Sequence, residues 1–248
     1  MAKSKIAYVC NDCGAEYGQW QGQCSACKAW NTLSKVQLGK SSSSPATSAD
    51  FRRDGYAGAT SDVQTLANID LDALPRYSSS IGELDRVLGG GLVPGSVILV
   101  GGNPGAGKST VLLQIMCNLS ATGKKALYVT GEESLQQVGM RAKRLKLPEQ
   151  HLKMFAETNV EKICEAAQEH KPEIFVVDSI QVMHSSEVPS APGSVSQVRE
   201  SAAYLIQYAK QTNTVLILVG HVTKEGNLAG PKVLEHMIDC FVMLEGGS

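Results

Sequence analysis

The sequence has no long hydrophobic run and few aromatic residues. Of its 248 residues 43% are hydrophobic but only 5% are aromatic. No stretch approaches the roughly 18 consecutive apolar residues of a membrane-spanning helix. The apolar run near the N-terminus, residues 6–9, is too short for the hydrophobic region of a secretory signal. The composition therefore excludes a membrane protein and predicts a cytoplasmic one.

An excess of positive charge is also absent. Lysine and arginine together number 23 against 24 aspartates and glutamates, which gives a formal net charge of -1. This balance argues against a protein coated in positive charge. Any binding of nucleic acid is therefore expected to be local, in a groove or a channel.

What is present divides the chain into three segments. Residues 1–35 contain a cluster of cysteines and both tryptophans, and we expect a zinc finger there. Residues 36–62 are rich in serine and lack apolar periodicity, which predicts a flexible linker. Residues 63–248 alternate apolar runs with amphipathic stretches, which predicts a single larger domain.

The third segment has the pattern of an α/β fold. Apolar runs typical of strands in a parallel sheet occupy residues 97–100, 126–129, 174–177, 215–219 and 240–244. Helical spacing lies between them, in a stripe of Leu135, Val138, Ala142 and Leu145 and in a second helix over residues 202–210. Alternating strands and helices predict a mostly parallel sheet wound by right-handed crossovers.

The strongest motif is a glycine-rich loop of the form G-x-x-x-x-G-K-[ST] between the first predicted strand and a helical pattern. Its predicted nucleotide-binding residues are Gly102, Asn103, Pro104, Gly105, Ala106, Gly107, Lys108, Ser109 and Thr110. Backbone N–H groups and the helix N-terminus would face the phosphates of ATP. Lys108 would neutralise the β- and γ-phosphates, and the Ser109 hydroxyl would bind Mg²⁺. The competing interpretation, a turn with a solvated lysine, does not explain the strand–loop–helix context.

Acidic residues follow two further predicted strands. Asp178 comes directly after residues 174–177, where a carboxylate can bind the same Mg²⁺, although a lone aspartate there is also a common turn or helix cap. Glu132 and Glu133 follow residues 126–129, at the edge where open α/β sheets bind their ligands. One glutamate would polarise the attacking water and the other would orient it, with Glu132 the first choice. Alternatively, the pair simply starts the next helix, where negative charge is favourable.

His221 follows the predicted strand over residues 215–219. At that position it would contact the γ-phosphate and relay its presence to the following loop. The alternative is a structural histidine with satisfied hydrogen bonds.

The cysteines have the spacing of a metal site. Cys10, Cys13, Cys24 and Cys27 form a C-x2-C-x10-C-x2-C pattern, and four thiolates in two close pairs suit one tetrahedral Zn²⁺ with no open position. A segment this short needs the metal for its stability. Ordinary reduced thiols and redox-active pairs are the alternatives. Cys117, Cys164 and Cys240 lie singly, and we expect them to be small buried residues.

Two segments after predicted strands, residues 185–194 and 224–232, are rich in flexible residues. In a ring of subunits such loops would line the channel, where Lys224, Lys232 and backbone amides would meet DNA phosphates. The alternative is a pair of ordinary surface loops.

The sequence resembles the bacterial RadA (Sms) family of DNA repair proteins. The resemblance rests on motifs that occur in the same order: the cysteine cluster, the phosphate loop, and Glu132, Asp178 and His221 with their neighbours. The resemblance covers essentially the whole chain. It implies a RecA-like ATPase core that forms hexameric rings on single-stranded DNA. It also implies a motor that works with RecA recombinase to extend branched DNA by branch migration. The two flexible segments would be the DNA contacts.

The family continues into a Lys-Asn-Arg-Phe-Gly motif and a Lon-protease-like domain, which this sequence does not include. We therefore expect ATP binding with weak hydrolysis and little branch migration. DNA-stimulated turnover equal to that of a full-length relative would contradict this expectation.

Two other functions remain open. One is a nucleotide-switched adaptor that binds DNA or RecA without translocation, which a strand-displacement assay would separate from a motor. The other is a phosphotransferase of the circadian-clock ATPase type, which shares the phosphate loop and paired glutamates but leaves the cysteine cluster unexplained.

Overall fold

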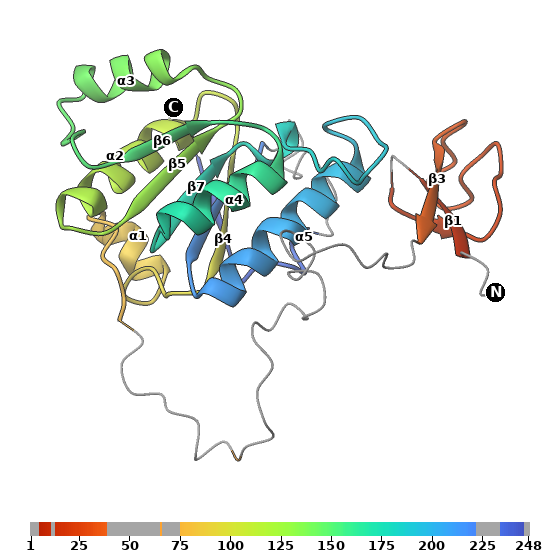
Figure 1. Cartoon of the computed structure of the whole chain (residues 1–248), viewed down its shortest axis with the longest axis horizontal. Coiled ribbons are helices and arrows are strands. Elements are labelled where there is room, and N and C mark those ends of the chain that lie inside the picture. The colour runs from red at the N-terminus through yellow and green to blue at the C-terminus, as the bar shows by residue number, and fades with distance from the viewer. Residues whose placement is uncertain (1–4, 11–12, 39–64, 66–74, 222–233, 246–248) are drawn as a thin grey trace.

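The computed structural model describes residues 5–10, 13–38, 65, 75–221 and 234–245 (Figure 1). The predicted flexible segment over residues 224–232 lies outside the described residues, as does most of the predicted linker. The first three linker residues, 36–38, are described, and they belong to a strand. That strand continues three residues past the expected boundary, because it pairs with another strand along its whole length.

The N-terminal region is a small antiparallel sheet, which we call the ribbon. Its strands are β1 (Lys5–Cys10), β2 (Glu16–Tyr17) and β3 (Leu33–Leu38), in the spatial order β2-β1-β3. Among its described residues the buried hydrophobic side chains are those of Cys10, Cys24 and Leu33. So small an apolar core does not stabilise a fold by itself.

The second region is built on a six-stranded sheet with the order β6-β5-β7-β8-β4-β9, in which every pairing is parallel. Its strands are β4 (Val97–Gly102), β5 (Ala126–Thr130), β6 (Lys153–Ala156), β7 (Ile174–Asp178), β8 (Val215–Val219) and β9 (Cys240–Leu244). The strands β4, β5, β7 and β8 are buried along their entire length. The predicted fold class, an α/β P-loop core with a mostly parallel sheet behind a small cysteine finger, is confirmed.

Helices cover both faces of this sheet (Figure 1). The helices are α1 (Gly82–Val87), α2 (Lys108–Ala121), α3 (Leu135–Arg144), α4 (Val160–His170) and α5 (Val195–Thr212), with a 3₁₀ turn η3 (Ile180–Val182). Residues of α2 and α3 share one buried cluster with strand residues such as Ile98, and α4 and α5 share the other with residues such as Leu99. Successive strand side chains therefore point to opposite faces, each of which is closed by a helical layer.

Three local expectations differ from the structure. β6 was not predicted, because it is an edge strand of partly exposed residues with no continuous apolar run. Val138 and Ala142 of the predicted helical stripe are buried, but Leu135, the first residue of α3, is 43% exposed. Cys117 and Cys164 are buried as expected, whereas Cys240 is only partly buried because β9 is the other edge strand.

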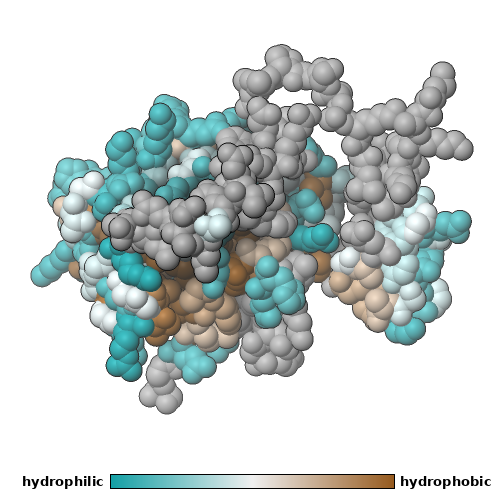
Figure 2. All heavy atoms as spheres, turned by 90° about the horizontal axis from the view of Figure 1, so that it is seen from below, coloured by the Kyte–Doolittle hydropathy of each residue, from teal (hydrophilic) through white to brown (hydrophobic). Residues whose placement is uncertain are grey.

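The surface is mixed in character. In the view of Figure 2 a hydrophobic area lies among largely hydrophilic side chains. No helix within the described ranges combines the length and the apolar character needed to cross a membrane.

Candidate active site and metal centre

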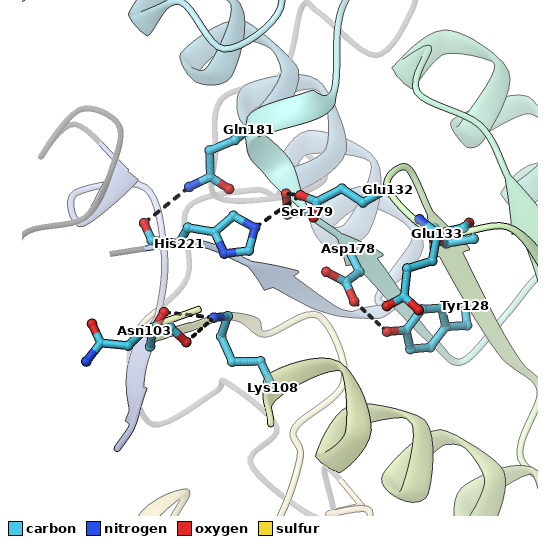
Figure 3. Close-up of polar contacts among 11 residues, drawn as sticks. Asn103, Lys108, Tyr128, Glu132, Glu133, Asp178, Ser179, Gln181 and His221 are labelled. Carbon is cyan, nitrogen blue, oxygen red and sulfur yellow. Dashed lines mark hydrogen bonds and ion pairs between the residues drawn. The ribbon is translucent and has the colours of Figure 1, made fainter. Parts of the chain in front are cut away.

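Four adjacent strands bring the predicted catalytic residues to one edge of the sheet. In the order β5-β7-β8-β4, Glu132 follows β5, Asp178 ends β7, His221 follows β8, and Lys108 lies beyond the loop after β4. Figure 3 shows these side chains converging above the start of α2. The carboxyl ends of parallel strands meet at one edge, so residues far apart in the sequence form one site.

The phosphate loop has the backbone that anion binding requires. Gly105 and Gly107 have positive φ angles of 84° and 88°, and a Cβ atom at either position would meet no neighbouring atom within 4 Å. Alternating left-handed residues turn backbone N–H groups toward a common concavity. α2 begins immediately afterwards at Lys108, so its N-terminal N–H groups face the same space.

The Lys108 ammonium is held over this loop. Its Nζ donates to the carbonyl oxygens of Gly102 at 2.7 Å and Asn103 at 3.0 Å, and the side chain is buried. Burial lowers the pKa of Lys108, and the nearby Asp178 and Glu132 carboxylates partly offset that effect. The two carbonyl contacts are ones that phosphate oxygens can replace, so the loop and its lysine fit a triphosphate tail.

Asp178 is oriented by a tyrosine from the neighbouring strand. The hydroxyl of Tyr128, in the middle of β5, donates to Asp178 Oδ2 at 2.7 Å. Burial and the adjacent Asp178 carboxylate raise the pKa of Tyr128 well above its usual value, so the tyrosine stays a donor. Ser109, the other predicted magnesium ligand, is the second residue of α2. A hydroxyl and a fixed carboxylate are oxygen ligands of the kind that Mg²⁺ prefers.

Glu132 accepts two hydrogen bonds on one carboxylate oxygen. The Ser179 hydroxyl donates to Oε1, and His221 Nε2 lies 3.1 Å from the same atom. Burial alone would raise the pKa of Glu132. The bonds from Ser179 and His221, with the charge of Lys108, outweigh burial, so the pKa of Glu132 lies below its ordinary value. The carboxylate is therefore ionised at neutral pH.

Glu133 has a different environment from Glu132. Its carboxylate forms a close, half-buried ion pair with Arg141 of α3. Its backbone N–H donates to Thr130 Oγ1 at 3.1 Å, and the Thr130 hydroxyl donates back to the Glu133 carbonyl at 2.9 Å. Neither glutamate caps α3, because Ser134 is the N-cap residue and forms a capping box with Gln137.

His221 connects Glu132 to a segment beyond the described residues. Its carbonyl oxygen accepts a hydrogen bond from Gln181 Nε2 at 3.5 Å. Its Nδ1 atom is buried and has no hydrogen-bond partner within the described part of the chain. Residues 222–233, which follow it, are outside that part, so Lys224 and Lys232 are not placed.

The first predicted DNA-contacting segment, residues 185–194, is held by one side chain of α5. Gln197 accepts from the Ser185 N–H at 3.0 Å and donates to the carbonyl oxygens of Val188 and Ser190 at 3.0 and 2.8 Å. Both Ser185 and Gln197 are buried. The segment is therefore anchored to the fold at its base, although its composition predicted a flexible loop.

The four predicted zinc ligands converge in the ribbon. Their Sγ atoms all lie within 4.8 Å of one another, with Cys10–Cys27 at 3.7 Å and Cys13–Cys24 at 3.4 Å. A tetrahedral site with metal–sulfur bonds of about 2.3 Å requires sulfur–sulfur distances of about 3.8 Å. The donor set therefore fits one thiophilic metal ion.

The two cysteine pairs lie in equivalent turns. The N–H of Cys10 donates to Ala15, and that of Cys24 to Ala29, at 2.9 and 2.8 Å. The left-handed residue of each turn, Gly14 or Lys28, donates its N–H to the first cysteine's carbonyl. Because Lys28 occupies a position where glycine is favoured, the sequence did not reveal this repeat.

Several residues of the site were not predicted. Tyr128 lies inside an apolar strand, and Arg141 lies off the apolar stripe of its helix. Ser179 and Gln181 follow Asp178 closely in the sequence, and nothing in their spacing indicated a role. For Tyr128 the sequence did offer a signal: its hydroxyl lies in an otherwise apolar run, and a buried hydroxyl needs a hydrogen-bond partner.

The fold and this edge define a P-loop ATPase core with a metal-binding ribbon. The chain belongs to the AAA domain family, whose model matches residues 68–227, and residues 8–35 match the rubredoxin metal binding domain. It is 63% identical over 248 residues to the DNA repair protein RadA of Haemophilus influenzae. It is 59% identical to the RadA of Escherichia coli and 45% identical to that of Bacillus subtilis.

Each alignment covers 99% of this chain and 53% of the relative. The chain thus spans about half the length of the curated relatives it matches. The resemblance to the RadA family is confirmed.

Proposed function

We propose that the protein is a DNA-dependent ATPase of recombinational DNA repair. In this proposal it acts in the cytoplasm as a homo-hexamer on single-stranded and branched DNA, and promotes branch migration together with RecA recombinase. The observation that supports the ATPase most is the convergence of Lys108, Asp178 and Glu132 over a phosphate loop. The DNA substrate is supported by the names of the relatives, which are DNA repair proteins.

The residues of the edge divide the work of ATP hydrolysis. Residues 102–110 would hold the phosphates through backbone N–H groups and Lys108, while Ser109 and Asp178 would hold Mg²⁺. The nucleotide supplies the phosphoryl group that is transferred to water, and Mg²⁺ neutralises charge on its oxygens. Zn²⁺ in the ribbon would be structural, because four thiolates leave no coordination position open.

Glu132 is the residue best placed to accept a hydrogen bond from the attacking water. It is ionised and hydrogen-bonded to Ser179 and His221, whereas the carboxylate of Glu133 is held in an ion pair with Arg141. A positioned carboxylate can accept the proton of a nucleophilic water. His221 shares the Glu132 oxygen, so movement of Glu132 toward a bound nucleotide would free His221 and alter the chain that follows it.

The test is an ATPase assay with and without single-stranded DNA, beside calorimetry with Mg²⁺ and ATP. We expect heat of binding and DNA-stimulated phosphate release, and loss of both with Lys108→Ala. Met140→Ala, at an exposed position on α3, is the matched control and should leave both unchanged. Absence of binding heat with folded protein would contradict the proposal.

A further inference from the structure

The ribbon exposes two large aromatic side chains that its own fold does not use. Trp20 is 56% exposed and Trp30 is 70% exposed, and they are the only two tryptophans of the chain. A tryptophan side chain buries a large apolar area when it finds a partner, so leaving two of them in water is unfavourable. We call these two residues the tryptophan pair.

The backbone of the ribbon brings the pair together. Gln23 and Trp30 form an antiparallel bridge, and the N–H of Asn31 donates to the carbonyl of Gly22 at 2.7 Å. A Cβ atom built on Gly22 would lie 3.8 Å from Trp20 Cη2 and 3.8 Å from Trp30 Cζ3. Both indole rings therefore border one glycine, within van der Waals reach of the position that its Cβ atom would occupy.

The surroundings of the pair suit an anionic polymer with flat bases. No aspartate or glutamate occurs from residue 17 to residue 49, although the chain has 24 of them. Lys28 is exposed, and the neighbouring polar residues carry amides or hydroxyls, as in Gln21, Ser25 and Asn31. Within this stretch of sequence phosphates would therefore meet no repelling carboxylate, and base edges would meet hydrogen-bonding groups.

We propose that the tryptophan pair is a stacking site for unpaired bases of single-stranded DNA. Stacking on aromatic rings is tolerant of sequence because every base has a π-face. The choice of DNA rests on the proposed function, and the tryptophan pair is made of residues outside the ATPase edge and outside the two segments expected to contact DNA. Since one lysine contributes the charge nearby, stacking supplies most of the affinity.

The pair provides its own reporter. Both tryptophans of the chain lie in the ribbon, so tryptophan emission reports on this site alone. We expect a short oligothymidine to quench the emission of the full, metal-loaded chain saturably and without nucleotide. An abasic oligomer of the same length, which keeps the phosphates but has no bases, should not quench. Absence of quenching, or equal quenching by the abasic oligomer, would overturn the proposal.

Substitutions test the contribution of each ring. Trp20→Ala and Trp30→Ala should each weaken oligothymidine binding, measured by anisotropy of a labelled oligomer, by about fivefold to a hundredfold. Trp20→Phe and Trp30→Phe should restore most of the affinity, and Met140→Ala on α3 should change nothing. Alanine variants that keep their metal and bind as tightly as the parent would contradict the proposal. If they lose the metal, the quenching experiment and the phenylalanine variants decide.

The outcome is separable from that of the proposed function. Lys108→Ala should keep the full quenching, because the phosphate loop is not part of this site. Quenching without ATPase activity would refute the ATPase proposal and support the stacking site. ATPase activity without quenching would support the ATPase proposal and refute the stacking site.

Discussion

The sheet domain and the ribbon are stabilised by different physics. In the sheet domain β4, β5, β7 and β8 are entirely buried, and apolar clusters fill both faces between strands and helices. Among the ribbon side chains that the structure describes, the buried hydrophobic ones are those of Cys10, Cys24 and Leu33, and two of these three are candidate metal ligands. Burial of apolar area therefore supports the first region, whereas the second has a set of sulfur donors that fits a stabilising metal ion.

The difference shows how one chain can contain two units that different perturbations destabilise. The apolar core of the sheet domain depends on packing, which a cavity damages. If the ribbon depends on a metal held by its four cysteines, chelation or oxidation of the thiols will unfold it. Its stability does not require burial of Trp20 and Trp30, which are exposed. The first two predictions below each perturb one unit and monitor the other, and the last two concern the sheet domain alone.

Removal of the metal is expected to have the largest effect. Structural zinc contributes on the order of 10–16 kcal/mol of binding free energy to small metal domains. A chelator, or Cys24→Ala, should unfold the ribbon while the denaturation midpoint of the sheet domain stays constant. Metal analysis and tryptophan emission follow the ribbon, and far-UV circular dichroism follows the sheet. Cys240→Ala is the control, and equal metal loss in that variant would contradict the assignment.

Truncation of the sheet core comes next. Phe175 is fully buried in β7 and packs edge-to-face on Tyr208, with ring centroids 5.8 Å apart. Phe175→Ala should lower the free energy of unfolding by about 3–5 kcal/mol, measured by denaturant titration. The ribbon should keep its metal, and Val87→Ala, at an exposed position, should change little. A parallel loss of metal would show that the two regions fold together.

Neutralising the glutamates should separate catalysis from stability. Glu132→Gln should slow ATP hydrolysis by roughly a hundredfold to ten-thousandfold with nucleotide binding retained, because the water loses its acceptor. Glu133→Gln should slow it less, since that carboxylate is paired with Arg141. Single-turnover rates and calorimetric affinities measure the two effects. A larger loss with Glu133→Gln would reverse the assigned roles.

The smallest expected effect is on stability against pH. The pKa of Glu132 in the folded protein lies below its ordinary value of 4.5, so its charge stabilises the fold above that pH. That contribution disappears as the pH falls through the folded-state pKa. Compared with Glu132→Gln, the parent should be more stable near neutral pH by less than about 1 kcal/mol, and the difference should vanish in acid. Denaturant titrations at both pH values measure it, and a difference that grows in acid would contradict the assignment.

Much of the fold was predictable because its signals are local. Five of the six strands of the large sheet were expected from apolar runs, and the convergence of the four cysteines was expected from their spacing. β6 was missed because an edge strand need not be apolar on both faces. The extent of β3 was missed because pairing with β1, and not composition, sets where it ends.

The candidate site was predictable in its parts but not in its connections. Lys108, Glu132, Asp178 and His221 each follow a strand, so the rule for parallel sheets places them at one edge. The sequence did not show which residue contacts each carboxylate. In the structure Tyr128 contacts Asp178, Ser179 contacts Glu132, and Arg141 contacts Glu133. These pairs join residues on different strands or on a strand end and a helix, and their identity depends on strand order.

By itself, the sequence determined the class of fold, the phosphate loop and the four sulfur ligands, because hydrophobic periodicity and motif spacing are properties of neighbouring residues. Only the tertiary structure decided which glutamate is hydrogen-bonded to Ser179 and His221 and which is paired with Arg141. It alone brought Trp20 and Trp30 to the same glycine. The Glu132 contacts join residues distant in the chain, since Ser179 and His221 lie 47 and 89 positions away. Those contacts exist only once the strands have paired and packed.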